Sequence, residues 1–258
     1  MNAAIGIALL PRSAALSVPA RKRKPASVAL LRTPCQACNL RELCLPAGME
    51  ATEMARLQGV VRTRRRVARG AALYRAGAGF EALYAVRSGF FKSSVVLEDG
   101  RDQVTAFHMA GELVGMDGIG HDRHAADVIA LEDSEVCVIA YGRLEEAGLE
   151  RQLHKVMSRE LVRGQGVMML LGTMRAEERL AAFLLNLSQR FVARGYSPSD
   201  FHLRMTREEI GSYLGLSLET VSRLFSRFHA EGLVAVQQKH IRILDVAGLR
   251  GVMYQNGK

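Results

Sequence analysis

The sequence lacks a long apolar run: nothing in its 258 residues approaches the roughly eighteen apolar residues of a membrane helix. No membrane association is therefore expected, and the expected location is the cytoplasm. A signal peptide is not expected either, because the basic residues 21–24 follow the apolar residues 3–10, whereas a signal peptide carries its charges first. We predict that residues 1–33 form a disordered extension whose basic run adds non-specific affinity for DNA. An organellar transit peptide is the alternative.

Enzyme signatures are missing as well. The sequence contains no P-loop, no dinucleotide-binding fingerprint and no recognisable pairing of a nucleophile with a base. We therefore predict that the protein is not an enzyme and has no catalytic residues.

Charge is unevenly distributed along the chain. Residues 76–150 contain five Lys or Arg and fourteen Asp or Glu, a net charge of −9, although the whole chain carries +9. The remainder therefore carries +18. An acidic middle between basic ends indicates separate tasks, with nucleic acid as a partner of the basic parts. Solvated basic faces without such a partner are the alternative.

Cysteine is scarce, and its spacing is informative. Cys35, Cys38 and Cys44 form a C-x2-C-x5-C motif, and Cys137 lies far along the chain in an apolar, strand-like run. Four thiolates complete a tetrahedral zinc site or ligate one iron–sulfur cluster. In isolation Cys137 would more often be a small buried side chain, but the three clustered thiols are an incomplete ligand set. The spacing predicts metal binding on all four cysteines and does not decide between zinc and iron.

The middle of the chain predicts a sheet followed by a long helix. Between residues 69 and 139 short apolar runs alternate with glycine-bearing turns, as in a small antiparallel barrel or sandwich. Asp99-Gly100, between residues 93–97 and 103–107, predicts a hairpin because Asp-Gly accepts the positive φ angles of a tight turn.

A helix is predicted over residues 145–173. One stripe of this helix repeats at steps of four, three, four and three, like a coiled-coil seam: Met157, Leu161, Gly164, Met168 and Leu171. The stripe predicts that the helix pairs with its twin in a homodimer. Packing against its own barrel is the alternative.

The C-terminal third has the pattern of a winged helix-turn-helix. Thr206 begins a capping box with Glu209, Gly215 makes the turn, and Ser217 suits the N-cap of a second helix. That helix divides into an apolar side and a polar side, as a DNA-reading helix requires. Residues 234–236 and 241–243 predict a two-stranded wing.

The polar side of the second helix offers groups that recognise bases. Arg223 can donate two hydrogen bonds to guanine, Glu219 can accept one from cytosine, and Ser222 can reach a base or a phosphate. A surface ion pair between Glu219 and Arg223, worth about 0.2–0.5 kcal/mol, is the alternative use of these two residues. The candidate DNA-binding residues are Thr206, Ser217, Glu219, Thr220, Ser222 and Arg223.

These features, in this order, resemble the FNR branch of the cAMP receptor protein superfamily, from about residue 34 to residue 244. The matching segments are C-Q-A-C-N-L-R-E-L-C-L-P (35–46), L-Y-A-V-R-S-G (83–89), F-H-M-A-G-E-L-V-G-M-D (107–117), A-E-E-R-L-A-A-F (176–183) and, most specifically, M-T-R-E-E-I-G-S-Y-L-G-L-S-L-E-T-V-S-R-L (205–224).

The resemblance implies an α+β fold of several parts. Its expected parts are a cluster-binding segment and β-roll sensor domain (34–144), a dimerisation helix (145–173) and a winged helix-turn-helix (174–247). The β-roll is expected to be cyclic-nucleotide-binding-like, a double-stranded β-helix or jelly roll. Outside the resemblance we expect the disordered extension (1–33) and a C-terminal tail (248–258).

The resemblance also implies an oxygen-responsive transcription regulator. An oxygen-labile [4Fe–4S] cluster on Cys35, Cys38, Cys44 and Cys137 would favour pairing of the long helix. The two recognition helices would then read a palindrome of TTGAT-like half-sites about 34 Å apart. Oxygen would destroy the cluster and switch binding off, and RNA polymerase is an expected partner.

Two departures from the family pattern qualify this expectation. Gly164 stands where FNR proteins commonly carry an aspartate, whose charge would help to keep cluster-free subunits apart. Gly111-Glu112 matches the nucleotide-binding branch, but Arg123-His124-Ala125 lacks the serine of its phosphate cassette, so no cyclic nucleotide is expected. The alternatives are a regulator of the same fold that responds to nitric oxide, zinc or a nucleotide, and an iron–sulfur electron carrier, which would leave the recognition helix without a use.

Overall fold

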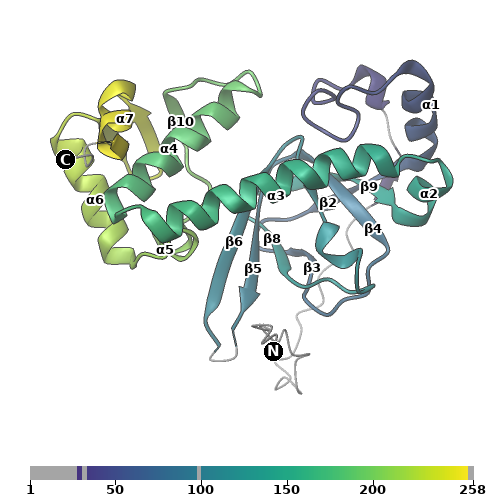
Figure 1. Cartoon of the computed structure of the whole chain (residues 1–258), viewed down its shortest axis with the longest axis horizontal. Helices are drawn as coiled ribbons and strands as arrows, with labels where there is room; N and C mark the ends of the chain where they lie inside the picture. Colours follow the sequence, from purple (N-terminus) through teal and green to yellow (C-terminus); the bar gives the residue numbers. More distant parts are fainter. Residues whose placement is uncertain (1–27, 31–33, 98–99, 255–258) are drawn as a thin grey trace, which may run out of the picture.

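The computed structural model describes residues 28–30, 34–97 and 100–254 (Figure 1). Most of the predicted disordered extension, residues 1–27 and 31–33, lies outside the described residues. Its remaining part is strand β1 (Val28–Leu30), which pairs antiparallel with β2.

Two antiparallel sheets form the N-terminal β-roll. One has the strand order β1-β2-β9-β4-β7 and the other β3-β8-β5-β6. Their strands are β2 (Val61–Val67), β3 (Ala72–Tyr74), β4 (Ala82–Ser88), β5 (Phe90–Val96), β6 (Asp102–Met109), β7 (Leu113–Val114), β8 (Asp127–Ala130) and β9 (Ser134–Ala140). Val86 and Val136 from the first sheet and Phe91 and Val128 from the second are buried in one cluster, so the sheets share a core. The predicted roll and its hairpin, formed by β5 and β6, are confirmed.

A second core lies at one end of the roll, where short helices cover the first sheet. Helix α1 (Ala51–Val60) leads into β2, and helix α2 (Tyr141–Glu146) follows β9. Leu57 of α1, Leu83 of β4 and Leu144 of α2 are buried together there. This core supports the segment that carries the first three cysteines.

The long helix α3 (Glu150–Thr173) runs from the roll to the C-terminal domain (Figure 1). It begins five residues later than the predicted helix over 145–173. Gly148 has a φ of +64° and separates α2 from α3, because a residue in the left-handed region ends the regular helix. The part of the prediction that joined residues 145–149 to the long helix is therefore wrong.

The C-terminal domain is a winged helix-turn-helix, as predicted. Its elements are α4 (Ala176–Val192), β10 (Asp200–His202), α5 (Arg207–Leu214), α6 (Leu218–Ala230), β11 (Val234–Gln237), β12 (His240–Ile243) and α7 (Val246–Tyr254). The predicted capping box is present: Glu209 N–H donates to Thr206 Oγ1 over 3.1 Å, and Thr206 N–H donates to Glu209 Oε2 over 2.7 Å. Gly215, at φ +64°, ends α5 as predicted. Strand β10, which adds a third strand to the wing, was not predicted.

The prediction that residues 248–258 form a C-terminal tail is wrong for residues 248–254, which are the described ones. Residues 246–254 form α7, which packs against α4, and its Leu249 is fully buried. Leu249 packs there because its side chain completes the apolar core of the C-terminal domain. Residues 255–258 lie outside the described residues.

The roll and the C-terminal domain are joined by a shared apolar core. Phe107 of β6 lies 6.2 Å from Phe183 of α4 and 5.2 Å from Tyr213 of α5, measured between ring centroids. Tilted rings at such distances pack favourably.

Within the described residues no helix is both long enough and apolar enough to span a bilayer.

The burial of Leu249 generates a stability prediction. Leu249→Ala should lower the free energy of unfolding by about 2–5 kcal/mol, because it removes a buried side chain from a packed core. Val246→Ala, at an exposed position of the same helix, is the matched control and should change little. Chemical denaturation measures both, and equal small effects would show that α7 does not belong to the core.

Candidate metal centre and nucleic-acid interface

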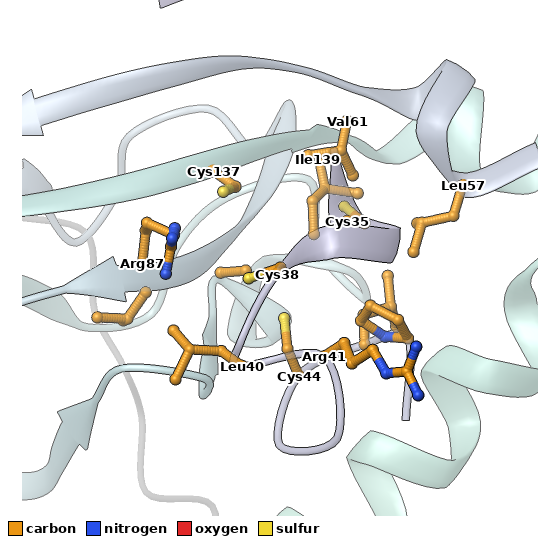
Figure 2. A pocket seen from close by; sticks show the side chains of 14 residues that line it. Cys35, Cys38, Leu40, Arg41, Cys44, Leu57, Val61, Arg87, Cys137 and Ile139 are labelled. Carbon is orange, nitrogen blue, oxygen red and sulfur yellow. The ribbon is translucent and has the colours of Figure 1, made fainter. Parts of the chain in front are cut away.

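The four predicted cysteines come together around one cavity (Figure 2). Cys35 and Cys38 lie on a tight turn, in which Cys38 N–H donates to the carbonyl of Cys35 over 3.1 Å. A second turn brings in Cys44, whose N–H donates to the carbonyl of Leu40 over 3.0 Å. Cys137 comes from strand β9, about a hundred residues along the chain, and completes the set.

The cavity is apolar, and this shapes the chemistry of the thiols. Burial, reinforced by the neighbouring cysteines, raises the pKa of Cys35 to about 11. Burial likewise raises the pKa of Cys44 to about 12 and also raises that of Cys137. With their pKa values raised in this way, these three thiols hold their protons at neutral pH unless a metal binds, so the site suits a ligand that supplies positive charge to bound thiolates.

Two arginines lie beside Cys137, and the sequence did not single them out. Arg64 of β2 is the register partner of Cys137, and its side chain is only 14% exposed. Arg87 of β4 lines the cavity and donates to Asn39 Oδ1 over 3.0 Å. Both guanidinium charges lower the pKa of Cys137, in opposition to its burial. They became visible only once the pairing of β2, β9 and β4 was known.

The donor set is compatible with an iron–sulfur cluster. All four cysteines are free thiols, and each lines the same cavity. In a [4Fe–4S] centre each thiolate binds a different iron, so four separate sulfur positions around a shared space are what it requires. In the described part of the chain no three His, Cys, Asp or Glu side chains are grouped so that they could hold a single metal ion.

The cysteine loop is attached directly to the long helix. Gln152, a buried residue in the first turn of α3, donates from Nε2 to the carbonyls of Leu45 (2.8 Å) and Ala47 (2.5 Å). Both carbonyls follow Cys44 closely in the chain. The position of the loop is therefore linked to the start of α3.

The predicted pairing stripe of α3 is divided between two environments. Met157 packs against the second core, and Leu171 is partly buried near Gly215. Between them Leu161 is 68% exposed and Met168 66% exposed, and a side chain at Gly164 would meet open space. Val162 and Met169 extend this exposed apolar surface.

The predicted recognition helix presents its polar face to solvent. Glu219, Ser222 and Arg223 are all exposed on α6, whereas its apolar face is buried. Ser217 caps α6 by accepting from Thr220 N–H over 3.1 Å. In the described residues no ion pair joins Glu219 to Arg223; Arg223 instead donates to Thr220 Oγ1 over 3.4 Å.

Arg207 is a further residue of this surface that the sequence did not reveal. Its guanidinium lies 3.5 Å from the ring centroid of Phe225 on α6. It also donates to the carbonyl of Gln238 at the tip of the wing over 3.1 Å. Arg207 therefore connects the first helix, the recognition helix and the wing.

Arg123 and His124, at the position of the phosphate cassette of the nucleotide-binding branch, have partners within the roll. Arg123 donates to the carbonyl of Gly77 over 2.8 Å. His124 is buried and stacks on Tyr74, with ring centroids 3.6 Å apart.

Comparison with known proteins agrees with this architecture. Residues 178–252 match the model of the Crp-like helix-turn-helix domain, and residues 64–150 match that of the cyclic nucleotide-binding domain. Among solved structures, FixK2 from Bradyrhizobium japonicum aligns with a TM-score of 0.68 at 30% identity, covering 73% of this chain and 96% of that one.

Curated relatives are transcription regulators. The chain is 47% identical to the transcriptional regulatory protein btr of Bordetella pertussis, over 86% of this chain and 93% of the relative. It is 45% identical to the transcriptional activator protein Anr of Pseudomonas protegens, with coverages of 82% and 88%. It is 43% identical to the fumarate and nitrate reduction regulatory protein of Escherichia coli K12, with coverages of 81% and 86%.

These relatives are regulators rather than enzymes, in agreement with the prediction that the chain has no catalytic role. The roll, the long helix and the winged helix-turn-helix are therefore those of a DNA-binding transcription regulator, and the chain belongs to the FNR-type regulators of the cAMP receptor protein/FNR superfamily.

Proposed function

We propose that this regulator responds to oxygen through a [4Fe–4S] cluster bound by Cys35, Cys38, Cys44 and Cys137. The observation that carries the proposal is the convergence of all four cysteines on one cavity in a chain that also has a DNA-reading domain. When bound, the cluster supplies an oxygen-sensitive centre that ties the loop to strand β9. Arg64 and Arg87 partly offset the negative charge that four thiolates bring to the site.

The protein's own residues then connect this site to dimerisation. Gln152 holds the loop at the start of α3, so an ordered loop supports the helix from its first turn. The exposed Leu161 and Met168 supply the apolar surface that a second copy would bury. Each subunit of the homodimer presents one α6 to one half of a palindromic TTGAT-like site, and RNA polymerase is the further partner. Cyclic nucleotide is not expected as a ligand, because Arg123-His124-Ala125 lacks the serine of the phosphate cassette and His124 stacks on Tyr74 instead.

Nitric oxide, zinc or a nucleotide as the signal would retain the same DNA-reading half, whereas an electron carrier would not need it. Metal analysis separates zinc and nucleotide from the proposed cluster. Comparing the effects of air and nitric oxide on the cluster separates the two gases, and specific DNA binding separates the regulator from an electron carrier.

The cluster prediction is tested by anaerobic purification. We expect a brown protein with about four iron and four sulfide per chain, which bleaches as air is admitted. Cys137→Ser should lose most of the iron, whereas Val138→Ala, on the same strand, should retain it. A colourless protein that is stable in air, or one that contains zinc, would contradict the proposed sensor.

The pairing surface is tested by Leu161→Glu. Two carboxylates placed opposite each other in an apolar seam should repel and lose solvation, so the anaerobic protein should sediment as a monomer. Val96→Glu, at an exposed apolar position of β5, is the control and should leave the sedimentation coefficient of the dimer unchanged. A dimeric Leu161→Glu protein would show that pairing uses another surface.

Base reading is tested by Arg223→Ala. Loss of a bidentate contact with guanine should cost about 1–3 kcal/mol of discrimination at that base pair. Binding to the palindrome and to a duplex with that guanine replaced measures the discrimination. Arg227→Ala, which removes an arginine of the same helix that pairs with Glu231 at 2.8 Å, should keep the preference. An unchanged preference in Arg223→Ala would remove Arg223 from the readout.

A further inference from the structure

The turn between β6 and β7 touches the cysteine loop. Gly111 in this turn has a φ of +90°, and a Cβ built on it would lie 2.8 Å from Cβ of Leu43. Leu43 directly precedes Cys44, so the backbone of the turn and the loop are in close contact. Any side chain at position 111 would have to displace Cβ of Leu43, which is attached directly to the backbone and is far less mobile than the end of a long side chain.

The next residue, Glu112, is a buried carboxylate in contact with three arginines. Arg190 of α4 donates to it over 2.7 Å, and Arg194, just beyond α4, donates over 2.6 Å. Arg163 of α3 lies 3.5 Å away. Burial alone would raise the pKa of Glu112, but the charges of these arginines prevail and hold it at about 2. The carboxylate is therefore ionised, and it stands between the roll, the pairing helix and the reading domain.

Two of these arginines also bind the backbone of the roll. Arg190 donates to the carbonyl of Phe107 over 2.7 Å, and Arg194 donates to that of Ala110 over 2.6 Å. The β6–β7 turn is thus held at several points by the end of α4. Separating one partner from a buried ion pair is costly, because the other charge then stays buried without a counter-charge. These contacts therefore favour one fixed position of the turn over a range of positions.

We propose that Leu43, Gly111 and Glu112 form a relay that transmits the position of the cysteine loop to the DNA-reading domain. A loop held by metal keeps Leu43 against Gly111, and the turn keeps Glu112 between Arg190, Arg194 and Arg163. A released loop lets the turn shift, the arginine contacts loosen, and the reading domain loses its orientation relative to α3. Glu112 acts in this relay as a positioning residue and does not touch DNA. The relay rests on the proposed function, because it needs a metal-dependent loop.

The test compares DNA affinity with and without the cluster. Wild type, Glu112→Gln and Arg163→Gln are each loaded anaerobically, their iron is counted, and their binding to a palindromic TTGAT duplex is measured before and after exposure to air. The control is Glu132→Gln, which removes the carboxylate of an exposed ion pair between the roll and the reading domain, with Arg204 at 2.9 Å.

We expect Glu112→Gln to carry as much iron as wild type. The ratio of its DNA affinity before exposure to air to its DNA affinity afterwards should be smaller than that of wild type by about tenfold or more, which corresponds to roughly 1.4 kcal/mol of coupling. Arg163→Gln should lose less, because Arg163 is the most distant and most exposed of the three arginines. Glu132→Gln should keep the wild-type ratio.

Each outcome leads to a decision. A wild-type ratio in loaded Glu112→Gln overturns the relay and leaves the proposed function standing. If Glu112→Gln does not fold or load, Arg163→Gln decides, and its wild-type ratio overturns the relay as well. A wild-type protein without iron, or with equal affinity in both states, overturns the proposed function and the relay with it.

Discussion

The register of strand β9 between β2 and β4 is the constraint on which the rest of the structure depends. Arg64 on one side and Ala85 on the other are the partners of Cys137. Side chains alternate along a strand, so a slip of one residue would turn Cys137 to the opposite face of the sheet and turn its neighbours with it. The register is protected because Val136, next to Cys137, and Ile139, two residues further on, are buried in the two cores of the roll. The position of the thiol is thus secured by apolar packing that has no role in metal chemistry.

The sequence predicted the elements whose signals are local. Thr206, Glu209, Gly215 and Ser217 determine the ends of the two helices through contacts within a few residues, and each has its predicted role. The cysteine loop belongs to the same class, because its spacing alone identified the first three thiols. What could not be predicted depends on distant pairings. The contacts of Arg64 and Arg87 need the sheet register, those of Glu112 need the packing of α4 on the roll, and α7 is a helix because Leu249 finds a distant core.

The roll matches the cyclic nucleotide-binding domain, and two of its buried polar residues have partners inside the protein. His124 lies in an aromatic stack, and Glu112 is surrounded by arginines of the C-terminal half. Aromatic packing around Phe107 adds an apolar contact between the same two parts. Charged and apolar contacts therefore act on one junction. A scaffold of this kind can change its signal while the domain that reads DNA stays the same.

The uneven support of α3 has a consequence for how the regulator depends on its own abundance. The first turns of the helix are anchored by Gln152, Leu153 and Val156, which are buried against the roll. The later turns contain Gly164, Gly166 and Gly172 and expose several apolar side chains, among them Leu161 and Met168. Each glycine weakens a helix by about 1 kcal/mol relative to alanine, so pairing with a second copy, as proposed, would add order to these turns. If α3 pairs as proposed, dimerisation is a second-order process, so the number of copies in the cell would set the signal level at which the regulator responds. A change in expression level would shift the response threshold without any change in the sensor.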